Sequence, residues 1–381
     1  MNRKFLPGAT IGVMGGGQLG RMFAIAARTM GYRVEIFTPD DESPAGQFAD
    51  RTHRADYRDE AAVRQFAQSV DVVTFEFENI PIATIEWCAQ DRDVRPAGAI
   101  LHTAQNRVRE KNFLAGAGIP VAPYRAVRSA AELQVGVSEI GTPAILKTAA
   151  FGYDGKGQQR IDQDADLVAV WSASSADELV LEGAVDFQME LSSIVAQDAA
   201  GTMATFPVCE NIHRDHILDV TVVPARIDPA VEKQAAELAR AIAEKLELVG
   251  LLAVEMFLRA DGELVVNELA PRPHNSGHWS IEGCVTSQFE QQVRAVCGLP
   301  LGATDILQPS AMANILGNEW KRGEPNWENA LGAPGVHLHL YGKSEPRPRR
   351  KMGHLTAVGA TAEEAIARVT RAREGLQAGK R

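Results

Sequence analysis

The stretch LLAVEMFLRADGELVVNEL, residues 251–269, has two apolar runs on either side of a turn. Asp261-Gly262 is a typical two-residue type I′ turn, so the stretch predicts an antiparallel hairpin. Counting outward from such a turn places Glu255 directly opposite Glu268 on one face of the sheet. Their β-carbons would then lie about 4.5 to 5.5 Å apart.

Two facing carboxylates repel each other unless one is protonated or a cation lies between them. Apolar neighbours on both strands, such as Val254 and Val266, argue against a solvated pair. Oxygen ligands of this kind favour Mg²⁺, which keeps its remaining positions for water and nucleotide phosphates. We therefore expect Glu255 and Glu268 to bind magnesium, and a charged hairpin without metal is the alternative.

Lys147 ends the apolar run Ala144–Leu146 and is followed by GYDGKGQ, residues 152–158. A lysine at the end of a strand and a flexible glycine loop are suited to clamping ATP phosphates. The order of residues is not that of a Walker A loop, and a plain hairpin turn is the alternative. We expect this loop to be mobile and to close over ATP.

Near the N-terminus, an apolar strand at Ala9–Met14 leads into Gly15-x-Gly17-x-x-Gly20 and a helical pattern. With Glu35 twenty residues after the first glycine, this matches the dinucleotide fingerprint of NAD enzymes. Backbone amides at a helix N-terminus hold any phosphate or other anion, however. A tight turn that only lets strand and helix pack closely is the alternative.

Composition limits the class of protein. A chain of 381 residues exceeds the usual size of one hydrophobic core, so two or three subdomains are expected. A net charge of −10 disfavours nucleic acid as a partner. Four scattered cysteines indicate reduced thiols rather than disulfides or a metal site. Because no apolar stretch is long enough for a membrane span, we expect a cytoplasmic enzyme without a membrane partner.

The order of elements predicts a mixed fold class, α/β followed by α+β. The first hundred residues alternate strand and helix as an open parallel sheet does. Residues 143–270 carry strands and one clear helix at Val231–Leu246, which indicates antiparallel sheet with helices. Short strands around Ala311–Leu316 and Val336–Tyr341 and a helix at Ala362–Leu376 follow.

Taken together, Lys147, the glycine loop, Glu182, Glu190 and the glutamate pair of the hairpin resemble the ATP-grasp superfamily over roughly residues 100–300. The resemblance is closer, and spans nearly the whole chain, to the 5-(carboxyamino)imidazole ribonucleotide synthetases of purine biosynthesis. It is carried by GGGQLGRM (15–22), GYDGKGQ (152–158), NELAPRPHNSGH (267–278) and GHL (353–355). The resemblance implies an ATP-grasp fold with a Rossmann-like preATP-grasp domain over 1–105, an ATP-grasp domain over 106–300 and a small β-rich C-terminal domain over 301–381.

The family reaction implied by this resemblance uses ATP, with Mg²⁺, to phosphorylate bicarbonate to carboxyphosphate. The amine of aminoimidazole ribonucleotide then captures the carboxyl group, and ADP and phosphate are released. A homodimer is also implied. The implied ATP contacts are Arg107, Lys147, Gly152, Tyr153, Asp154, Gly155, Lys156, Gly157, Gln158, Glu182, Gly183, Ala184, Val185, Glu190, His213, Asn267 and Glu268.

Catalytic roles are expected for Asp154, Arg272, His274, Asn275 and Lys351. Carboxyphosphate must form in a dry pocket of donors, which the run 272–275 can supply, and Asp154 would position or deprotonate the amine. A rigid loop in which Arg272 pairs with a structural carboxylate is the alternative. The ribonucleotide is expected to lie between domains, against Gly17, Gln18, Tyr153, Arg272, Lys343, Arg350 and Lys351.

Two features qualify the resemblance. Many superfamily members carry asparagine two residues after the second metal glutamate, where this chain has Ala270, so the magnesium shell would depend more on phosphates and water. The basic run around Arg347, Arg349 and Arg350 is of the kind that usually forms a solvated face.

Three other functions were weighed. An NAD-dependent dehydrogenase explains the first domain but leaves the glutamate pair, Lys147 and the 152–158 loop without a role. Other ATP-grasp enzymes, such as a formate-dependent glycinamide ribonucleotide transformylase or a biotin carboxylase, share the ATP site and differ in the acceptor pocket. A non-catalytic nucleotide sensor would be expected to lack the lysine or a metal carboxylate, and both are present.

Overall fold

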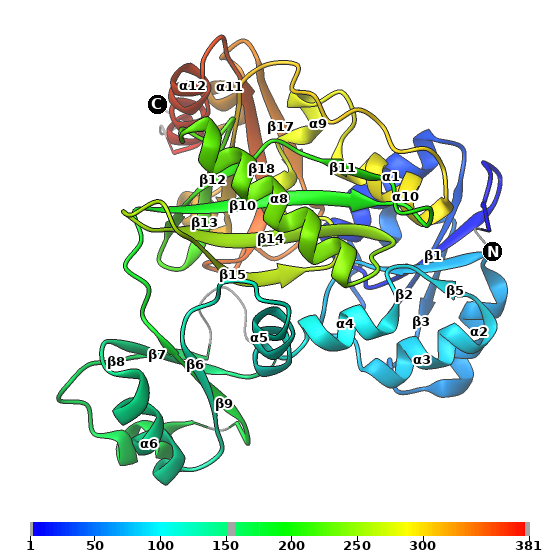
Figure 1. Ribbon diagram of the computed structural model, residues 1–381. Helices are drawn as coiled ribbons and strands as arrows, with labels where there is room; N and C mark the ends of the chain where they lie inside the picture. The colour runs from blue at the N-terminus through cyan, green and yellow to red at the C-terminus, as the bar shows by residue number, and fades with distance from the viewer. Residues whose placement is uncertain (1–2, 151–156, 175, 378–381) are drawn as a thin grey trace.

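The computed structural model describes residues 3–150, 157–174 and 176–377. They form an N-terminal domain, a large body built on one sheet, and a small lobe that projects from that body (Figure 1). In these residues, no helix is both long and apolar enough to cross a bilayer. All four cysteines are buried and unpaired with one another.

The N-terminal domain is a five-stranded parallel sheet in the order β3-β2-β1-β4-β5, which confirms the predicted open parallel sheet. Helix α1 begins at Gln18, within the glycine motif, and Gly17 serves as its N-cap. The elements are β1 Thr10–Met14, α1 Gln18–Thr29, β2 Arg33–Thr38, η1 Gly46–Phe48, β3 Arg51–Arg54, α2 Glu60–Ser69, β4 Val72–Phe75, α3 Ile82–Asp91, β5 Asp93–Val94 and α4 Gly98–Ala104.

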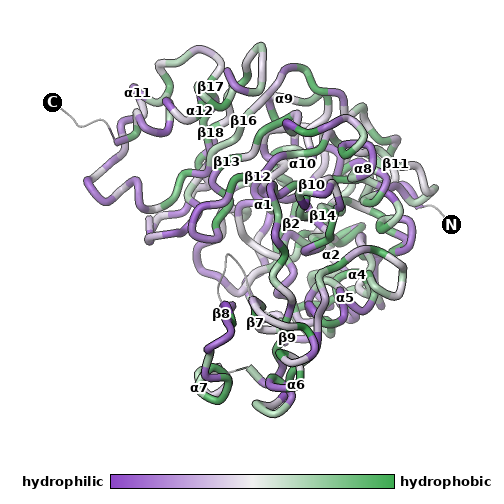
Figure 2. The backbone as a smooth tube through the Cα atoms, turned by 60° about the vertical axis from the view of Figure 1, so that its left-hand side comes forward, coloured by the Kyte–Doolittle hydropathy of each residue, from purple (hydrophilic) through white to green (hydrophobic). Residues whose placement is uncertain are grey.

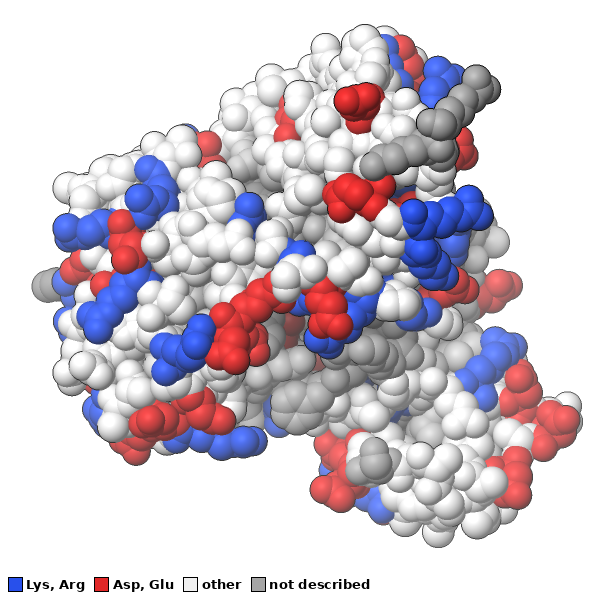
Figure 3. Space-filling view, turned by 180° about the vertical axis from the view of Figure 1, so that it is seen from behind, with Lys and Arg blue, Asp and Glu red and all other residues white. Residues whose placement is uncertain are grey.

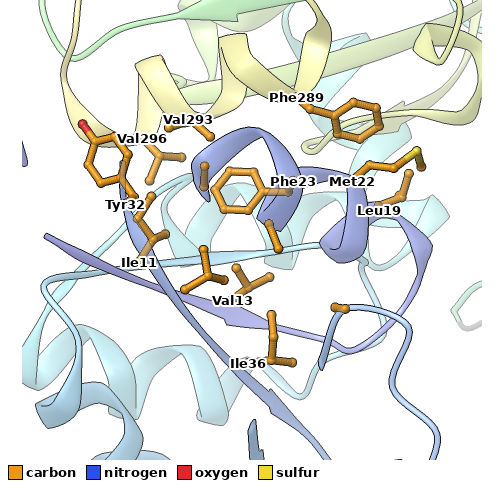
Figure 4. Packing of buried hydrophobic residues seen from close by; sticks show 14 of the residues in the cluster. Ile11, Val13, Leu19, Met22, Phe23, Tyr32, Ile36, Phe289, Val293 and Val296 are labelled. Atoms are coloured by element: carbon orange, nitrogen blue, oxygen red, sulfur yellow. The ribbon is translucent and has the colours of Figure 1, made fainter. Parts of the chain in front are cut away.

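Helix α1 packs between this sheet and helix α10 of the large body (Figure 4). Phe23 of α1 lies among Ile11 and Val13 of β1 on one side and Val293 of α10 on the other, all at most 3% exposed. One apolar core therefore fixes the glycine loop before α1 relative to the body that carries the hairpin.

The small lobe is a four-stranded antiparallel sheet in the order β6-β9-β7-β8 with two helices on it. Seen from behind, a hollow separates the lobe from the large body (Figure 3). Its elements, with the helix α5 that leads into it, are α5 Arg107–Gly116, β6 Tyr124–Val127, α6 Ala130–Ile140, β7 Ala144–Thr148, β8 Gln158–Ile161, α7 Leu167–Ala173 and β9 Leu179–Gly183.

The large body is one antiparallel sheet, with nine strands among the described residues, in the order β15-β14-β10-β12-β13-β16-β18-β17, and β11 beside β10. The strands of the C-terminal segment therefore continue the same sheet as β10, β14 and β15. Its elements are β10 Met189–Gln197, β11 Met203–Thr205, β12 Cys209–Arg214, β13 Ile217–Val223, α8 Pro229–Lys245, β14 Gly250–Leu258, β15 Leu264–Ala270, η2 Asn275–Gly277, α9 Ser280–Gly283, α10 Gln288–Cys297, β16 Ser310–Leu316, η3 Gly317–Arg322, α11 Trp327–Leu331, β17 Val336–Leu340, β18 Lys351–Val358 and α12 Ala362–Gly375.

The two faces of this sheet differ. Helix α8 covers one face over β10 and β14, and Leu191, Val195 and Ala239 are buried there (Figure 1). The opposite face meets the segment after β15, where Trp279 is fully buried among apolar strand residues. Figure 2 shows apolar chain around β14 and hydrophilic chain along β8 at the edge of the small lobe. Because Trp279 packs on the face opposite α8, residues 271–283 lie over that face of the sheet.

The hairpin that decided the fold has the predicted pairing but not the predicted turn. The backbone N–H of Arg259 donates to the carbonyl of Glu263, and the backbone N–H of Gly262 donates to the carbonyl of Arg259. Residues 260–262 therefore form a three-residue loop, in which Gly262 has φ 86°. That loop shifts the register by one residue, and a bulge between Met256 and Glu255 shifts it back. Glu255 consequently pairs with Glu268 as predicted. The predicted type I′ turn was wrong. The longer loop and the bulge shift the register in opposite directions, so Glu255 and Glu268 still face each other.

Candidate active site

A row of polar residues crosses the face of the sheet opposite α8. The pairing register places Thr221 of β13 beside Asn211 of β12, then Ser192 of β10, Glu255 of β14 and Glu268 of β15. Successive members lie on paired or diagonally adjacent positions, so their side chains share one face. This polar row leads from the buried centre of the sheet to the two carboxylates near its edge.

Each carboxylate of the hairpin meets a donor from a different element. His274 Nε2 lies 3.1 Å from Glu255 Oε1, and Arg107 Nη1 lies 2.9 Å from Glu268 Oε2. Burial opposes ionisation of Glu255, but the hydrogen bond from His274 and the charge of Lys351 lower its pKa to about 2. Glu255 can therefore remain ionised, as a ligand of a cation must.

The donor set suits magnesium only if other ligands complete it. Among the described residues, no group of three or more His, Cys, Asp and Glu side chains could hold a metal. The buried Oδ1 of Asn267, next to Glu268, has no hydrogen-bond partner there. Two carboxylates and a neighbouring amide oxygen fit a hard cation that takes its remaining ligands from phosphate and water.

Helix α5 supplies cations to the same region. Glu182 of β9 lies between two lysines, with Lys147 Nζ at 3.1 Å and Lys111 Nζ at 3.2 Å from its Oε2. Burial opposes the ionisation of Glu182, but the two lysine charges prevail and lower its pKa. Glu182 is also close enough to Arg107 to raise the pKa of that guanidinium. Three cations thus converge beside the glutamate pair, where polyphosphate charge would be neutralised.

The remaining predicted ATP contacts are only partly within the described chain. Gly152, Tyr153, Asp154, Gly155 and Lys156 lie outside the described residues. Gly157 adopts φ 74°, and Gln158 begins β8 opposite Lys147.

The segment Gly183–Val185 leaves the end of β9, and the amides of Gly183 and Ala184 donate to carbonyls of the loops at Pro123 and Pro143. Glu190 and His213 face each other with 2.9 Å between Oε2 and Nδ1. Burial disfavours protonated His213, but its Glu190 partner raises the pKa overall.

The run after β15 contains both paired and unpaired polar groups. Arg272 directs Nε and Nη2 to Glu78, at 2.7 and 2.9 Å, which is the structural pairing named above as the alternative. Asn275 is buried, and neither atom of its amide has a partner among the described residues. An orphaned buried amide is costly unless a ligand satisfies it. Asn275 is therefore the stronger candidate for contact with a small oxyanion.

The glycine loop before α1 is filled from within the protein. The carboxyl group of Glu76 accepts from the amides of Gly17 and Gly20, the latter at 2.8 Å. Burial raises the pKa of Glu76, although both hydrogen bonds oppose the shift. Glu35, the acid of the fingerprint, bonds His53 at 2.6 Å instead. The amides that would hold a dinucleotide pyrophosphate already have an acceptor, which counts against the NAD interpretation.

The C-terminal cations approach the site from β18 and the segment before it. Lys343 Nζ donates to the carbonyl of Lys351 at 2.7 Å, and burial lowers the pKa of Lys343 to about 8. Arg350 pairs with Glu42 of the N-terminal domain at 3.2 Å. Arg347 instead pairs with Glu345 on an exposed loop, as a solvated charge run would. The predicted substrate cations therefore lie where the first and last parts of the chain meet.

Several site residues were not predicted: Glu76, Glu78, Glu110, Lys111, Asn211, Ser192 and Gln288. The first two directly follow the buried parallel strand β4, and polar residues at that edge were the available signal. Lys111 was detectable as a lysine one helical turn after Arg107 on a helix whose charged residues are buried. The strands β12, β13 and β18 were also missed, and β18 carries Lys351.

Family models match three successive segments. A ribonucleotide synthetase preATP-grasp domain matches residues 8–105, an ATP-grasp domain matches 112–289, and a phosphoribosylaminoimidazole carboxylase C-terminal domain matches 310–368. A Bacillus subtilis protein described as N5-carboxyaminoimidazole ribonucleotide synthase is 47% identical over 365 residues, covering 96% of this chain and 95% of that protein. A Brucella melitensis protein of the same description is 43% identical, covering 92% and 97%.

Solved structures agree with these matches. An ADP complex of an N5-carboxyaminoimidazole ribonucleotide synthetase superposes with a TM-score of 0.92 at 44% identity, over 98% of each chain. An Aspergillus clavatus N5-carboxyaminoimidazole synthase in complex with ADP and 5-aminoimidazole ribonucleotide superposes with a TM-score of 0.87 at 33% identity, over 97% of this chain and 98% of that one. The chain is an ATP-dependent ligase, and it belongs to the N5-carboxyaminoimidazole ribonucleotide synthase family.

Proposed function

We propose that this enzyme carboxylates the amine of 5-aminoimidazole ribonucleotide, using ATP and bicarbonate, in de novo purine biosynthesis. The observation that carries the proposal is the position of the Glu255–Glu268 pair. On one side it meets Arg107 and the cluster around Glu182, and on the other it meets His274 beside the unsatisfied amide of Asn275. A phosphate-binding half and a small oxyanion-binding half thus share one cation site.

ATP is held by Arg107, Lys147 and Lys111, whose charges face the phosphates, with Glu182–Val185, Glu190 and His213 along the same cleft. Glu255 and Glu268 would hold Mg²⁺, which would withdraw charge from the phosphate oxygens. The segment 152–158, of which only Gly157 and Gln158 are among the described residues, is proposed to clamp the nucleotide.

Bicarbonate is oriented by His274 and Asn275, which present hydrogen-bond donors to its oxygens as ATP phosphorylates it. Arg272, held by Glu78, adds fixed positive charge close to Glu268. Because Asn275 is buried and the side chains of Arg272 and His274 are only 15% and 14% exposed, little water reaches the reactive carboxyphosphate. The amine then attacks its carbonyl carbon, phosphate leaves, and Asp154 takes the amine proton.

The ribonucleotide lies between the N-terminal domain and β18, against Gly17, Gln18, Lys343, Arg350 and Lys351. Support comes from the Aspergillus clavatus relative, which was crystallised with 5-aminoimidazole ribonucleotide and ADP. The charge of Lys351 contributes to the pKa shifts of both Glu255 and His213, which supports a place for Lys351 between the ribonucleotide and the carboxylation site. We further propose that the enzyme is cytoplasmic and a homodimer.

The test measures ADP release with Mg-ATP and bicarbonate, with and without 5-aminoimidazole ribonucleotide. Strong stimulation with consumption of the amine is expected. ATP turnover that ignores this ribonucleotide but responds to another amine, such as glycinamide ribonucleotide with formate, would overturn the substrate assignment and retain the ATP site. A parallel binding assay with NAD should show no binding.

A further inference from the structure

A chain of hydrogen bonds runs from the buried end of the polar row to His274. Thr221 Oγ1 donates to Asn211 Oδ1 at 3.1 Å, and Asn211 Nδ2 donates to Ser192 Oγ at 2.9 Å. Ser192 Oγ donates to Ser276 Oγ at 2.8 Å, which in turn lies 2.9 Å from His274 Nδ1. The four residues before the histidine are at most 6% exposed, so water does not compete for these bonds.

A contact with the backbone of Ser276 shows which ring nitrogen of His274 accepts a hydrogen bond. The backbone N–H of Ser276 points at His274 Nδ1 from 3.3 Å, and a backbone amide can only donate. Nδ1 therefore offers a lone pair. Because Ser276 Oγ already accepts from Ser192, its own hydrogen is available for Nδ1 as well. In the neutral ring the remaining hydrogen is then on Nε2, which faces Glu255.

The backbone that carries the histidine is also held in place. Gln288, which is fully buried, accepts from the backbone N–H of His274 at 2.8 Å and donates to its carbonyl at 2.7 Å. A β-carbon on Gly277 would lie 2.4 Å from Gln288 Oε1, so the loop closes tightly against this amide. This clamp fixes the backbone at His274, from which the ring reaches Ser276 with Nδ1 and Glu255 with Nε2.

We infer that Ser276 and Ser192 are positioning residues that hold the His274 ring with Nδ1 as an acceptor toward the serines, so that Nε2 carries the ring hydrogen and donates into the site. In the structure Nε2 faces Glu255 Oε1 at 3.1 Å. The inference rests on the proposed function only for a further receiving oxygen, of bicarbonate or of the carboxyphosphate derived from it, which would share this donor with Glu255. A fixed donor aimed at developing oxygen charge stabilises the transition state without reorganisation. A base at this position would instead need its lone pair on Nε2.

The direct test is ¹⁵N NMR of the full-length protein labelled in its histidine rings. The His274 signals are identified by their loss in His274→Gln. We expect Nδ1 to resonate as a nitrogen with a lone pair and Nε2 as a nitrogen that carries hydrogen. A His274 ring with hydrogen on Nδ1 would overturn the inference.

The chain offers a matched pair of substitutions for the second test. Ser192 and Ser193 are adjacent on β10 and both fully buried, but Ser193 points to the opposite face and its Oγ has no hydrogen-bond partner among the described residues. Ser192→Ala frees Ser276 Oγ to accept from His274 Nδ1 and leaves only the 3.3 Å backbone contact to oppose that tautomer. It should therefore mix the two tautomers of His274 and lower kcat about tenfold, with KM for ATP changed less than about twofold. Ser193→Ala should change neither the His274 signals nor kcat. If Ser192→Ala and Ser193→Ala changed the His274 signals equally, the positioning role of Ser192 would be refuted.

The two proposals fail differently. If the ribonucleotide does not stimulate ADP release but the tautomer is as expected, the proposed substrate is wrong and the positioning of His274 stands. If the wild-type enzyme carboxylates the ribonucleotide and His274 carries hydrogen on Nδ1, the function stands and the inference is wrong.

Discussion

Two fully buried histidines should make the stability of this protein fall steeply in mild acid. His278 and His354 lie with ring centroids 4.8 Å apart, and His354 stacks on His339 at 4.5 Å. Burial, followed by the charges of neighbouring groups, lowers the pKa of both rings well below the ordinary value of 6.5. In the unfolded chain each ring takes up a proton near pH 6.5, whereas in the folded chain it stays neutral. The stability from each ring is thus complete above pH 6.5 and is lost as the pH falls.

The size of the effect follows from proton linkage. If neither ring is protonated in the folded protein down to pH 5, each loses about 2 kcal/mol of unfolding free energy between pH 7 and pH 5. Other groups also titrate in this range; Glu110, for example, has its pKa raised to about 8 by burial. The pH profile of the wild type alone therefore does not separate the histidine contribution from the others. The difference between the profiles of the wild type and a histidine variant does.

His354→Gln is the informative change. Between pH 7 and pH 5 this variant should lose about 2 kcal/mol less unfolding free energy than the wild type, although it is less stable at both. Urea unfolding followed by the fluorescence of buried Trp279 measures the difference. His337→Gln, which removes an exposed histidine from β17, is the control and should lose as much as the wild type. Identical losses in the wild type and in His354→Gln would refute the reasoning.

Three further changes test the site. Glu268→Gln should lower ADP formation at least about 100-fold at any Mg²⁺ concentration, because it removes one of the two facing carboxylates, and normal turnover would contradict the metal role. Lys147→Met should weaken ATP binding at least about tenfold in calorimetry, while the exposed Lys245→Met should not. Glu76→Ala leaves two glycine-loop amides without their acceptor and should cost about 1–3 kcal/mol of unfolding free energy, measured against exposed Glu86→Ala.

Local patterns predicted the parts of the site that depend on short-range order. The apolar runs predicted the hairpin, and the strand ending in Lys147 was correct to within one residue. The facing of Glu255 and Glu268 was predicted although the turn was wrong. The longer loop shifts the strand register by one residue, and the bulge shifts it in the opposite direction by one residue. A turn signal such as Asp-Gly carries no information about a bulge several residues away.

What could not be predicted depends on contacts between distant segments. Glu76 enters the glycine loop from a strand 56 to 59 residues away, and Arg272 meets Glu78 across 194 residues. The sequence of the loop indicates only that an anion fits there. Whether the anion is a ligand or a side chain is decided by the parallel neighbour β4, whose polar end has no periodic signal.

The polar row explains why the site lies at this place on the sheet. Each buried hydroxyl or amide in an apolar sheet carries a desolvation cost, which is offset only if every member finds a partner. Thr221, Asn211 and Ser192 satisfy one another in sequence and pass the remaining donor to the loop that bears His274. Because the strands beneath them are rigid, the donor at His274 is held relative to Glu255 without depending on the loop alone. The same row ends at the edge strand β15, where Glu268 pairs with Arg107. The charged groups proposed to bind the phosphates therefore lie at the edge of the sheet that faces the small lobe.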